Sequence, residues 1–486
     1  MNQRPSKLPL RAFAIDWDEF FAESPAPDVW YDTVFRWSAD QIRAYQNQMF
    51  MKRVAQGWEH PFYKKLWGDA GLVQADIRSL DDIEKLPMFD SEDVKQSISD
   101  NPPFGNVCGI DVAEVSRHTP LKIQTSGGTT GMPRPTIFGP KEWELNGLYL
   151  ARALYAQGAR PGDRMQIPST ASLANMGWGY YKACHDFLGI IPITTGSGLV
   201  TPSKRQVEIA FDFGTNIWTS FPEYLLQLAA TCKNELGRDV RELKTKLLST
   251  YLGPDLDDSL RRSVEEAWGC DAYDNYGTHE VYSVSFEGQD KDGMYIFEDA
   301  VFVEVVDQDT RKAVPSGTAG DLVCTHLHRE VPLLIRYNLR DLGRIKSEGK
   351  SALGSEFRRM DKFLGRSDQM VKIRATNVYP MACLGAVRSD DRTTGEWICI
   401  AERIERDGVV REEMTVRVEV RNDGRPRDGL KEMLEKRLRN DLGIRVPVEL
   451  IEEGQLVGTN VGKEGKPIRL IDERRTIKRE AGGAKP

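Results

Sequence analysis

The chain lacks the features that mark membrane proteins and nucleic-acid-binding proteins. Its 486 residues contain no run of about 18 or more apolar side chains, the length that a membrane-spanning helix needs. The apolar stretch after Leu8 is broken by Arg11 and ends at Asp16, which makes it a poor signal peptide. The formal net charge is −7 and no long basic stretch occurs. We therefore expect neither a membrane nor a nucleic acid as partner.

Disulfide chemistry is also not expected, because the seven cysteines are odd in number, lie far apart and form no CxxC pair. This usage is typical of a reduced, cytoplasmic protein. One local pattern, Cys324-Thr325-His326-Leu327-His328, would place three potential metal ligands on one side of a strand. Partly buried polar groups of a sheet strand would produce the same pattern, and both interpretations stay open.

Helical and strand-like patterns alternate through the middle of the chain. Residues 141–157, 222–236 and 257–268 have helical spacing of apolar side chains, and short apolar runs occur at 190–193, 217–218 and 247–249. This alternation predicts an α/β fold. Strand-like patterns dominate after residue 295, as at 301–306 and 321–324.

A separate unit is predicted at the C-terminal end. Residues 414–420 alternate as a half-buried strand does, and 428–442 place leucines on one helical face before Gly443, a typical helix stop. We therefore predict a large multi-subdomain N-terminal domain over 1–364 and a small, mobile α+β domain over 365–486.

The segment 124–134, Gln-Thr-Ser-Gly-Gly-Thr-Thr-Gly-Met-Pro-Arg, gathers hydroxyls and glycines in one short loop. Backbone amides freed by glycine and Ser/Thr hydroxyls can hold phosphate oxygens. The spacing is not that of the G-x-x-x-x-G-K-[ST] nucleotide-binding loop. An ordinary Gly/Thr turn is the alternative interpretation.

Five further motifs follow this loop. They are Gly-Pro-Asp at 253–255, Asp-Asn-Tyr-Gly-Thr-His-Glu at 274–280, Arg-Tyr-Asn-Leu-Arg-Asp at 336–341, Gly-Arg-Ser-Asp at 365–368 with Lys372 after it, and Gly-Lys-Pro at 465–467. Together they resemble the adenylate-forming enzymes, and within them the phenylacetate-CoA ligase family. Residues 61–87 and Pro103-Phe104-Gly105 are similar to the opening region of that family.

The resemblance implies an AMP-forming acid-CoA ligase. Such an enzyme uses ATP and Mg²⁺ to convert a carboxylic acid, here an aromatic or arylacetic one, to an acyl-adenylate, and then transfers the acyl group to CoA. The alternative is a stand-alone adenylating enzyme that passes the acyl group to a carrier-protein thiol or to an amine. A non-catalytic acyl-nucleotide-binding protein is a third possibility. We expect a monomer or homodimer.

The resemblance also implies roles for single residues. Glu280 would bind Mg²⁺, and Asp341 would accept hydrogen bonds from the ribose. From the residues alone, Asp341 could equally pair with Arg336 or Arg340. The remaining nucleotide-binding residues implied are Ser126, Gly127, Gly128, Thr129, Thr130, Gly131, Gly253, Pro254, Asp255, Asp274, Asn275, Tyr276, Gly277, Thr278, Arg366 and Lys372.

Two residues of the small domain are implied in the working cycle. Lys466 would reach the acyl carboxylate and the α-phosphate as a mobile point charge, with Lys463 as the competing candidate. Asp368 matches the hinge about which the small domain would turn between adenylation and thioester formation.

The chain departs from the family pattern at several positions. His279 precedes Glu280 at a position where a hydroxyl residue is usual in the family. As a catalytic residue, it could donate to the α-phosphate and add pH dependence near neutrality. Alternatively, its side chain could face the acyl pocket. Ala375 replaces a glycine of the thioester-forming step. The acyl pocket would draw on Ser172, Asn175, Trp178, Tyr180 and Tyr181, with Trp218 nearby. These aromatic residues could also belong to the core.

Overall fold

The computed structural model describes residues 14–126, 134–255, 258–367, 371–373, 376–378, 380–406, 409–442, 444–456 and 469–479. They form two compact units. The large unit takes in the described residues before Gly253 together with Leu260–Asp361. The small unit takes in the described residues of Gly253–Ser259 and those from Lys362 onward. The sequence predicts the domain boundary after residue 364.

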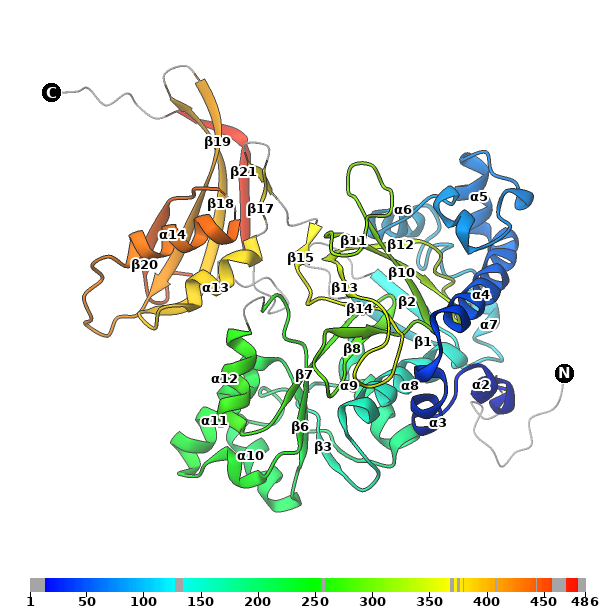
Figure 1. Cartoon of the computed structure of the whole chain (residues 1–486), viewed down its shortest axis with the longest axis horizontal. Helices are drawn as coiled ribbons and strands as arrows, with labels where there is room; N and C mark the ends of the chain where they lie inside the picture. The colour runs from blue at the N-terminus through cyan, green and yellow to red at the C-terminus, as the bar shows by residue number, and fades with distance from the viewer. Residues whose placement is uncertain are drawn as a thin grey trace. The chain divides into compact units, whose positions relative to one another are not determined.

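Helices dominate the first part of the large unit (Figure 1). Some of them start at capping side chains, since Asp16, Ser38 and Asp90 each accept a hydrogen bond from a backbone N–H of the first helical turn, while two others begin with proline. The helices are α2 (Trp17–Glu23), α3 (Pro27–Asp32), α4 (Ala39–Glu59), α5 (Pro61–Asp69), α6 (Ser91–Asp100) and α7 (Val112–Val115). Within the described part of the chain, no helix is both long and apolar enough to cross a membrane.

A nine-stranded sheet forms the centre of the large unit, in the order β13-β14-β9-β8-β7-β6-β5-β3-β4. From β4 to β7 all neighbours are parallel, and from β7 to β13 the neighbours are antiparallel. The strands are β3 (Arg164–Gln166), β4 (Ile191–Ile193), β5 (Ile217–Ser220), β6 (Leu247–Thr250), β7 (Ala272–Thr278), β8 (Tyr282–Glu287), β9 (Met294–Ile296), β13 (Ile345–Ser347) and β14 (Arg359–Met360).

Helices cover both faces of the parallel half. Ile217 and Leu247, register partners in β5 and β6, pack with α8 (Pro140–Gln157) and α9 (Asn175–Lys182). The next pair, Trp218 and Leu248, packs on the opposite side with α10 (Ser203–Phe213), α11 (Pro222–Leu236) and α12 (Ser259–Trp268). Successive strand side chains point to opposite faces, so each strand serves two cores. The predicted α/β class is confirmed.

Two smaller β-structures complete the large unit. Strands β10 (Val301–Val306), β11 (Gly320–His326) and β12 (Tyr337–Gly343) are antiparallel neighbours in that order. Strands β1 (Lys122–Ser126) and β2 (Arg134–Phe138) form an antiparallel ribbon in which Ser126 is the register partner of Arg134. At this end of the ribbon, Ser126 and Arg134 flank the predicted phosphate-binding segment in the sequence.

The small unit is built on a four-stranded sheet in the order β20-β19-β18-β21. Its long central pair, β18 (Thr393–Arg406) and β19 (Val409–Val420), is antiparallel, and the outer strands β20 (Val448–Glu452) and β21 (Leu470–Arg479) join in parallel. Helices α13 (Cys383–Arg388) and α14 (Leu430–Leu442) share one apolar cluster with this sheet. A short hairpin, β16 (Val371–Ile373) with β17 (Thr376–Val378), precedes them. The predicted strand and helix of this region are confirmed as β19 and α14.

Candidate active site

The carboxylate predicted to bind metal, Glu280, lies in the turn that joins β7 to the antiparallel β8. The turn is tight, because Thr278 is the register partner of Tyr282 and the Thr278 hydroxyl accepts a hydrogen bond from the Val281 N–H at 3.2 Å. At Gly277, an added Cβ would lie 2.2 Å from the carbonyl oxygen of Tyr282. The hairpin therefore requires glycine at 277 for close backbone approach.

Arg134, the first described residue after the predicted phosphate-binding segment, contacts Glu280. Its Nη2 donates to the Glu280 Oε1 at 3.1 Å, and both side chains keep about a fifth of their surface exposed. Because Ser126 is the register partner of Arg134, the last residue of β1 lies at the same end of the β1–β2 ribbon as this contact. The ribbon and the hairpin thus bring two motifs together that are 146 residues apart.

The buried side chain of Arg329 contacts the backbone of the hairpin turn. Arg329 has no exposed surface, and its Nη1 donates to the backbone carbonyl of Glu280. Its guanidinium lies 5.1 Å from the ring centroid of Phe138 and 4.8 Å from that of Tyr282. Burial lowers the pKa of Arg329, whereas the negative charges of Glu142 and Glu280 favour its charged form. Arg329 thus contacts the backbone of Glu280, whereas the Glu280 carboxylate contacts Arg134 of the ribbon.

His279 is a neutral side chain in this environment. Burial lowers its pKa to about 4, and the nearby Arg329 and Arg134 charges act in the same direction. The expected pH dependence near neutrality is therefore not supported for the ligand-free protein. Among the described residues, its buried Nε2 has no hydrogen-bond partner. Its carbonyl accepts a hydrogen bond from the Asn175 Nδ2 at 3.3 Å, which joins the hairpin to the predicted acyl segment.

Tyr276 and Asp341 lie together. The Tyr276 hydroxyl donates to the Asp341 Oδ2 at 2.7 Å, and both side chains are buried. The neighbouring arginines pair elsewhere, Arg336 with Glu304 at 2.8 Å and Arg340 with Asp90 at 2.5 Å. The hydrogen bond therefore joins the residue predicted to face the adenine to the residue predicted to face the ribose.

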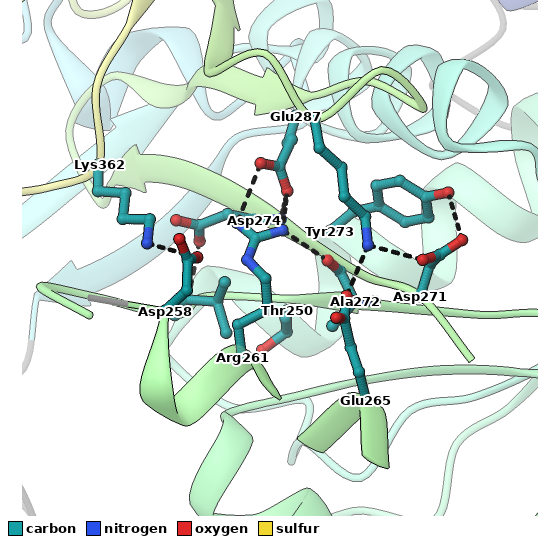
Figure 2. A network of polar contacts seen from close by, with 12 residues as sticks. Thr250, Asp258, Arg261, Glu265, Asp271, Ala272, Tyr273, Asp274, Glu287 and Lys362 are labelled. Atoms are coloured by element: carbon teal, nitrogen blue, oxygen red, sulfur yellow. Dashed lines mark hydrogen bonds and ion pairs between the residues drawn. The ribbon is translucent and has the colours of Figure 1, made fainter. Parts of the chain in front are cut away.

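The side chains of Asp274 and Asn275 form hydrogen bonds with backbone groups at the end of β6 and just beyond it. The Asp274 Oδ1 accepts from the N–H groups of Leu252 and Asn275, at 2.8 and 2.9 Å. Its own N–H donates to Glu287, which forms a two-pronged ion pair with Arg261 (Figure 2). Burial and the Glu287 charge raise the pKa of Asp274 to about 7.

The Asn275 side chain is also used within the sheet. Its Nδ2 donates to the Ser249 hydroxyl at 3.0 Å and to the Thr250 carbonyl at 2.9 Å, and its Oδ1 accepts from Gln157 at 3.0 Å. Both side chains thus position backbone in this structure, while their contact with a nucleotide stays a prediction.

Three predicted nucleotide-binding residues form a turn in the small unit. Gly253 has a φ of 67°, in the left-handed region that glycine adopts without strain. Pro254 follows it, and Asp255 is buried and accepts a hydrogen bond from Ser259 at 3.3 Å. The Lys362 ammonium donates to the Asp255 carbonyl at 2.6 Å.

Several predicted residues lie outside the described part of the chain. They are Gly127, Gly128, Thr129, Thr130, Gly131, Asp368, Ala375, Lys463 and Lys466. Ser126 ends β1, Arg366 lies in β15 (Gly365–Arg366), and Lys372 lies in β16, where Asn377 is its register partner. The roles of these residues stay predictions.

The predicted acyl-pocket residues divide into two groups. Ser172 is exposed, and its carbonyl accepts from the Trp178 indole N–H at 2.8 Å; Asn175 begins α9 and is half-buried. Tyr181 stacks on His185 with ring centroids 5.3 Å apart.

Tyr180, by contrast, is fully buried with its hydroxyl 3.3 Å from Ser249, and Trp218 is fully buried against Trp268. These two residues belong to the cores on the two sides of the sheet, where they offer no exposed surface to a substrate.

The two histidines of the Cys-x-His-x-His pattern form hydrogen bonds with backbone groups and so have a structural role. The His326 Nδ1 accepts from the N–H groups of His328 and Arg329, at 3.3 and 3.2 Å, and the His328 Nε2 donates to the Asp299 carbonyl at 2.8 Å. Burial lowers the pKa of both imidazoles, so both are neutral. Across the described ranges, no three His, Cys, Asp or Glu side chains form a group that could hold a metal. The interpretation as polar groups of a buried strand region therefore fits the structure.

Two cations of the site were not predicted from the sequence. Arg134 directly follows the glycine-rich segment, and this position is the signal that could have found it. Arg329 lies 49 residues from Glu280 in a connecting loop, and no local pattern points to it.

Comparison with known proteins agrees with this geometry. Residues 375–474 match the family described as AMP-binding enzyme C-terminal domain. A phenylacetate-coenzyme A ligase of Pseudomonas putida is 29% identical over 90% of this chain and 95% of its own length. That of Aromatoleum evansii is 28% identical over 90% and 96%. The crystal structure of a 2-hydroxyisobutyryl-CoA ligase in the postadenylation state superposes with a TM-score of 0.76 at 25% identity, covering 90% of each chain.

A large domain with helices on both faces of a parallel sheet and with these motifs, followed by this C-terminal domain, is the architecture of the adenylate-forming enzymes. Among them, four curated phenylacetate-coenzyme A ligases, 27 to 29% identical over about nine tenths of this chain, support the phenylacetate-CoA ligase family.

The raised pKa of Asp274 predicts a pH effect on stability. Its ordinary value is 3.8 and its value in the fold is about 7. Between these values the folded protein holds a proton that the unfolded chain has released, so the free energy of unfolding falls as the pH rises. Asp274→Asn cannot release this proton and keeps an acceptor oxygen. We expect the variant to lose less stability than the unchanged protein between about pH 5 and about pH 8.

The measurement is denaturant unfolding at both pH values, with Asp69→Asn as the control because Asp69 is exposed and its ion pair among the described residues is with its helix neighbour Lys65. Equal pH dependence in the Asp274 variant and the unchanged protein would contradict the assignment.

Proposed function

We propose that this protein activates a carboxylic acid with ATP to an acyl-adenylate and then transfers the acyl group to CoA. The observation that carries the proposal is the hydrogen bond of 2.7 Å between Tyr276 and Asp341, because it joins the predicted adenine contact to the predicted ribose contact. Tyr276 also lies only four residues before the metal-binding candidate Glu280. The names of the relatives support the same reaction. One of the similar solved structures holds 2-HIB-AMP and CoA in a thioesterification state.

The acid that we propose is aromatic or arylacetic. Phenylacetate is named for the curated relatives at 27 to 29% identity. In this chain, Trp178 is a half-buried aromatic residue of the predicted acyl segment, and Asn175, three residues earlier, has a buried Oδ1 without a partner among the described residues. A flat apolar surface and an unpaired acceptor in one segment suit an aryl acid with a polar group.

The residues of the hairpin fit a nucleotide with its metal. Glu280 supplies a partly exposed carboxylate, a hard oxygen ligand of the kind that Mg²⁺ prefers, and among the described residues Arg134 forms its ion pair. When bound, Mg²⁺ would neutralise part of the phosphate charge. The neutral His279 ring hydrogen-bonds the Gln124 backbone, so its Nε2, which has no partner in the described region, is an acceptor that adds no charge to the site.

The other residues orient the reactants. Tyr276 occupies one Asp341 oxygen, which fixes the plane of the carboxylate for ribose hydroxyl donors. Arg134 supplies a positive charge at the end of β2, beside the predicted phosphate-binding segment. Attack of one anion on another requires such neutralisation, and charges already in place need no reorganisation during the reaction.

Glu280→Gln tests the metal-binding role. Glutamine keeps the shape and an acceptor oxygen for Arg134 but lacks the charge. We expect acid-dependent pyrophosphate release to fall by about 100-fold or more, with partial recovery at high Mg²⁺, in an assay over a panel of aryl acids.

Glu114→Gln is the matched control, because Glu114 also pairs with an arginine, Arg117 at 3.0 Å, on an exposed surface. Loss of less than about threefold in the Glu280 variant would refute the role. Detection of the acyl-CoA thioester by mass after CoA is added tests the second step, and an adenylate that persists with CoA would favour a carrier-protein or amine acceptor.

Lys466→Ala tests the predicted catalytic lysine. A mobile ammonium at the acyl carboxylate and α-phosphate matters for adenylation, whereas the thioester step no longer needs it. We expect Lys466→Ala to lose pyrophosphate release and to keep thioester formation from supplied acyl-adenylate. Lys463→Ala is the matched control and should keep both steps. If the two variants exchange these results, Lys463 is the catalytic lysine; if both steps fail equally, neither role holds.

A further inference from the structure

Lys122, at the start of β1, lies in a corner between two indole rings. Its Nζ is 4.8 Å from the ring centroid of Trp178 and 5.6 Å from that of Trp143. The two rings are 6.3 Å apart and inclined at 64°. The negative faces of both indoles attract the ammonium, so the cation is held at a defined place by aromatic contacts.

No carboxylate of the described residues forms an ion pair with Lys122. The neighbouring Lys182 offers a contrast, since its Nζ lies 5.9 Å from the Trp143 centroid but pairs with Glu144 at 2.8 Å and Asp186 at 2.7 Å. Lys182 is thus neutralised by the fold. The half-buried Lys122 brings a positive charge to the same aromatic pair, and no anion of the described residues forms an ion pair with it.

This corner is continuous with the predicted acyl segment. The Thr125 N–H in β1 donates to the Leu173 carbonyl at 3.1 Å, and the Trp178 indole N–H donates to the Ser172 carbonyl at 2.8 Å. Three residues before Trp178, the Asn175 side chain donates to the His279 carbonyl in the hairpin turn. The Lys122 ammonium and the hairpin that carries Glu280 therefore contact the same segment, residues 172–178.

We propose that Lys122 determines substrate specificity by pairing with an anionic oxygen substituent on the ring of the aromatic acid, at the end away from the carboxylate that is activated. This inference rests on the proposed function. An indole face packs against an aryl ring, while the ammonium beside it gains a charge partner only when the ring carries one. A ring carboxylate supplies that partner. An unsubstituted ring leaves the cation with the indole faces alone, so the site favours the substituted acid.

The test compares phenylacetic acid with 4-carboxyphenylacetic acid, by the kcat and KM of pyrophosphate release. Lys122→Met keeps the length and the packing on the indoles but lacks the charge. We expect its kcat/KM for the carboxylated acid to fall by about tenfold or more, mainly through KM, and that for phenylacetic acid to stay within about threefold. Lys122→Arg should recover most of the loss because it restores the cation.

Thermal unfolding of each variant shows that it is folded, and Lys95→Met is the matched control, since Lys95 is exposed on α6 and pairs with Glu92. Equal losses for both acids would show a purely structural role and overturn the inference, as would no loss for either. Pyrophosphate release with other acids of the panel, but with neither of this pair, overturns the inference and leaves the proposed function standing. No release with any acid overturns the proposed function and the inference with it.

Discussion

The buried guanidinium of Arg329 is the contact on which the geometry of the site depends. A fully buried cation is costly unless other groups compensate for its lost hydration. Here the Glu280 carbonyl, the faces of Phe138 and Tyr282, and the charges of Glu142 and Glu280 compensate for part of it, while Nε and Nη2 have no hydrogen-bond partner among the described residues. These groups come from β2, from the β7–β8 hairpin and from α8. Compensation of a single charge therefore ties together the three elements that surround the metal-binding candidate.

The charge pattern of this region differs from that of the whole chain. The protein is acidic overall, with a formal net charge of −7, yet Arg134 and Arg329 contact the hairpin, and Lys122 lies in the same ribbon as Arg134. Burial keeps His279 neutral and raises the pKa of Asp274 to about 7. The polar groups that hold the backbone thus add little negative charge, which suits a site for substrates that are themselves anionic.

Family membership and acid specificity depend on different residues. The motifs around Tyr276, Glu280 and Asp341 carry the family resemblance, and we propose that they bind the nucleotide. The acid would be recognised by side chains of the 172–178 segment and of elements packed against it, including Lys122 and Trp143. The second group can change while the first stays, because the two lie on different strands and helices.

The sequence by itself determined the α/β class, most strands and helices, and the order of the motifs, since periodicity and turn chemistry act over a few neighbouring residues. It also pointed to Tyr276, Glu280 and Asp341 as members of one site. Only the tertiary structure decided that Tyr180 and Trp218 belong to cores, that Arg134 and Arg329 contact Glu280, and that the Cys324–His328 pattern supports a strand end. The physical reason is that burial and pairing arise from packing between segments far apart in the chain, for which local spacing carries no signal.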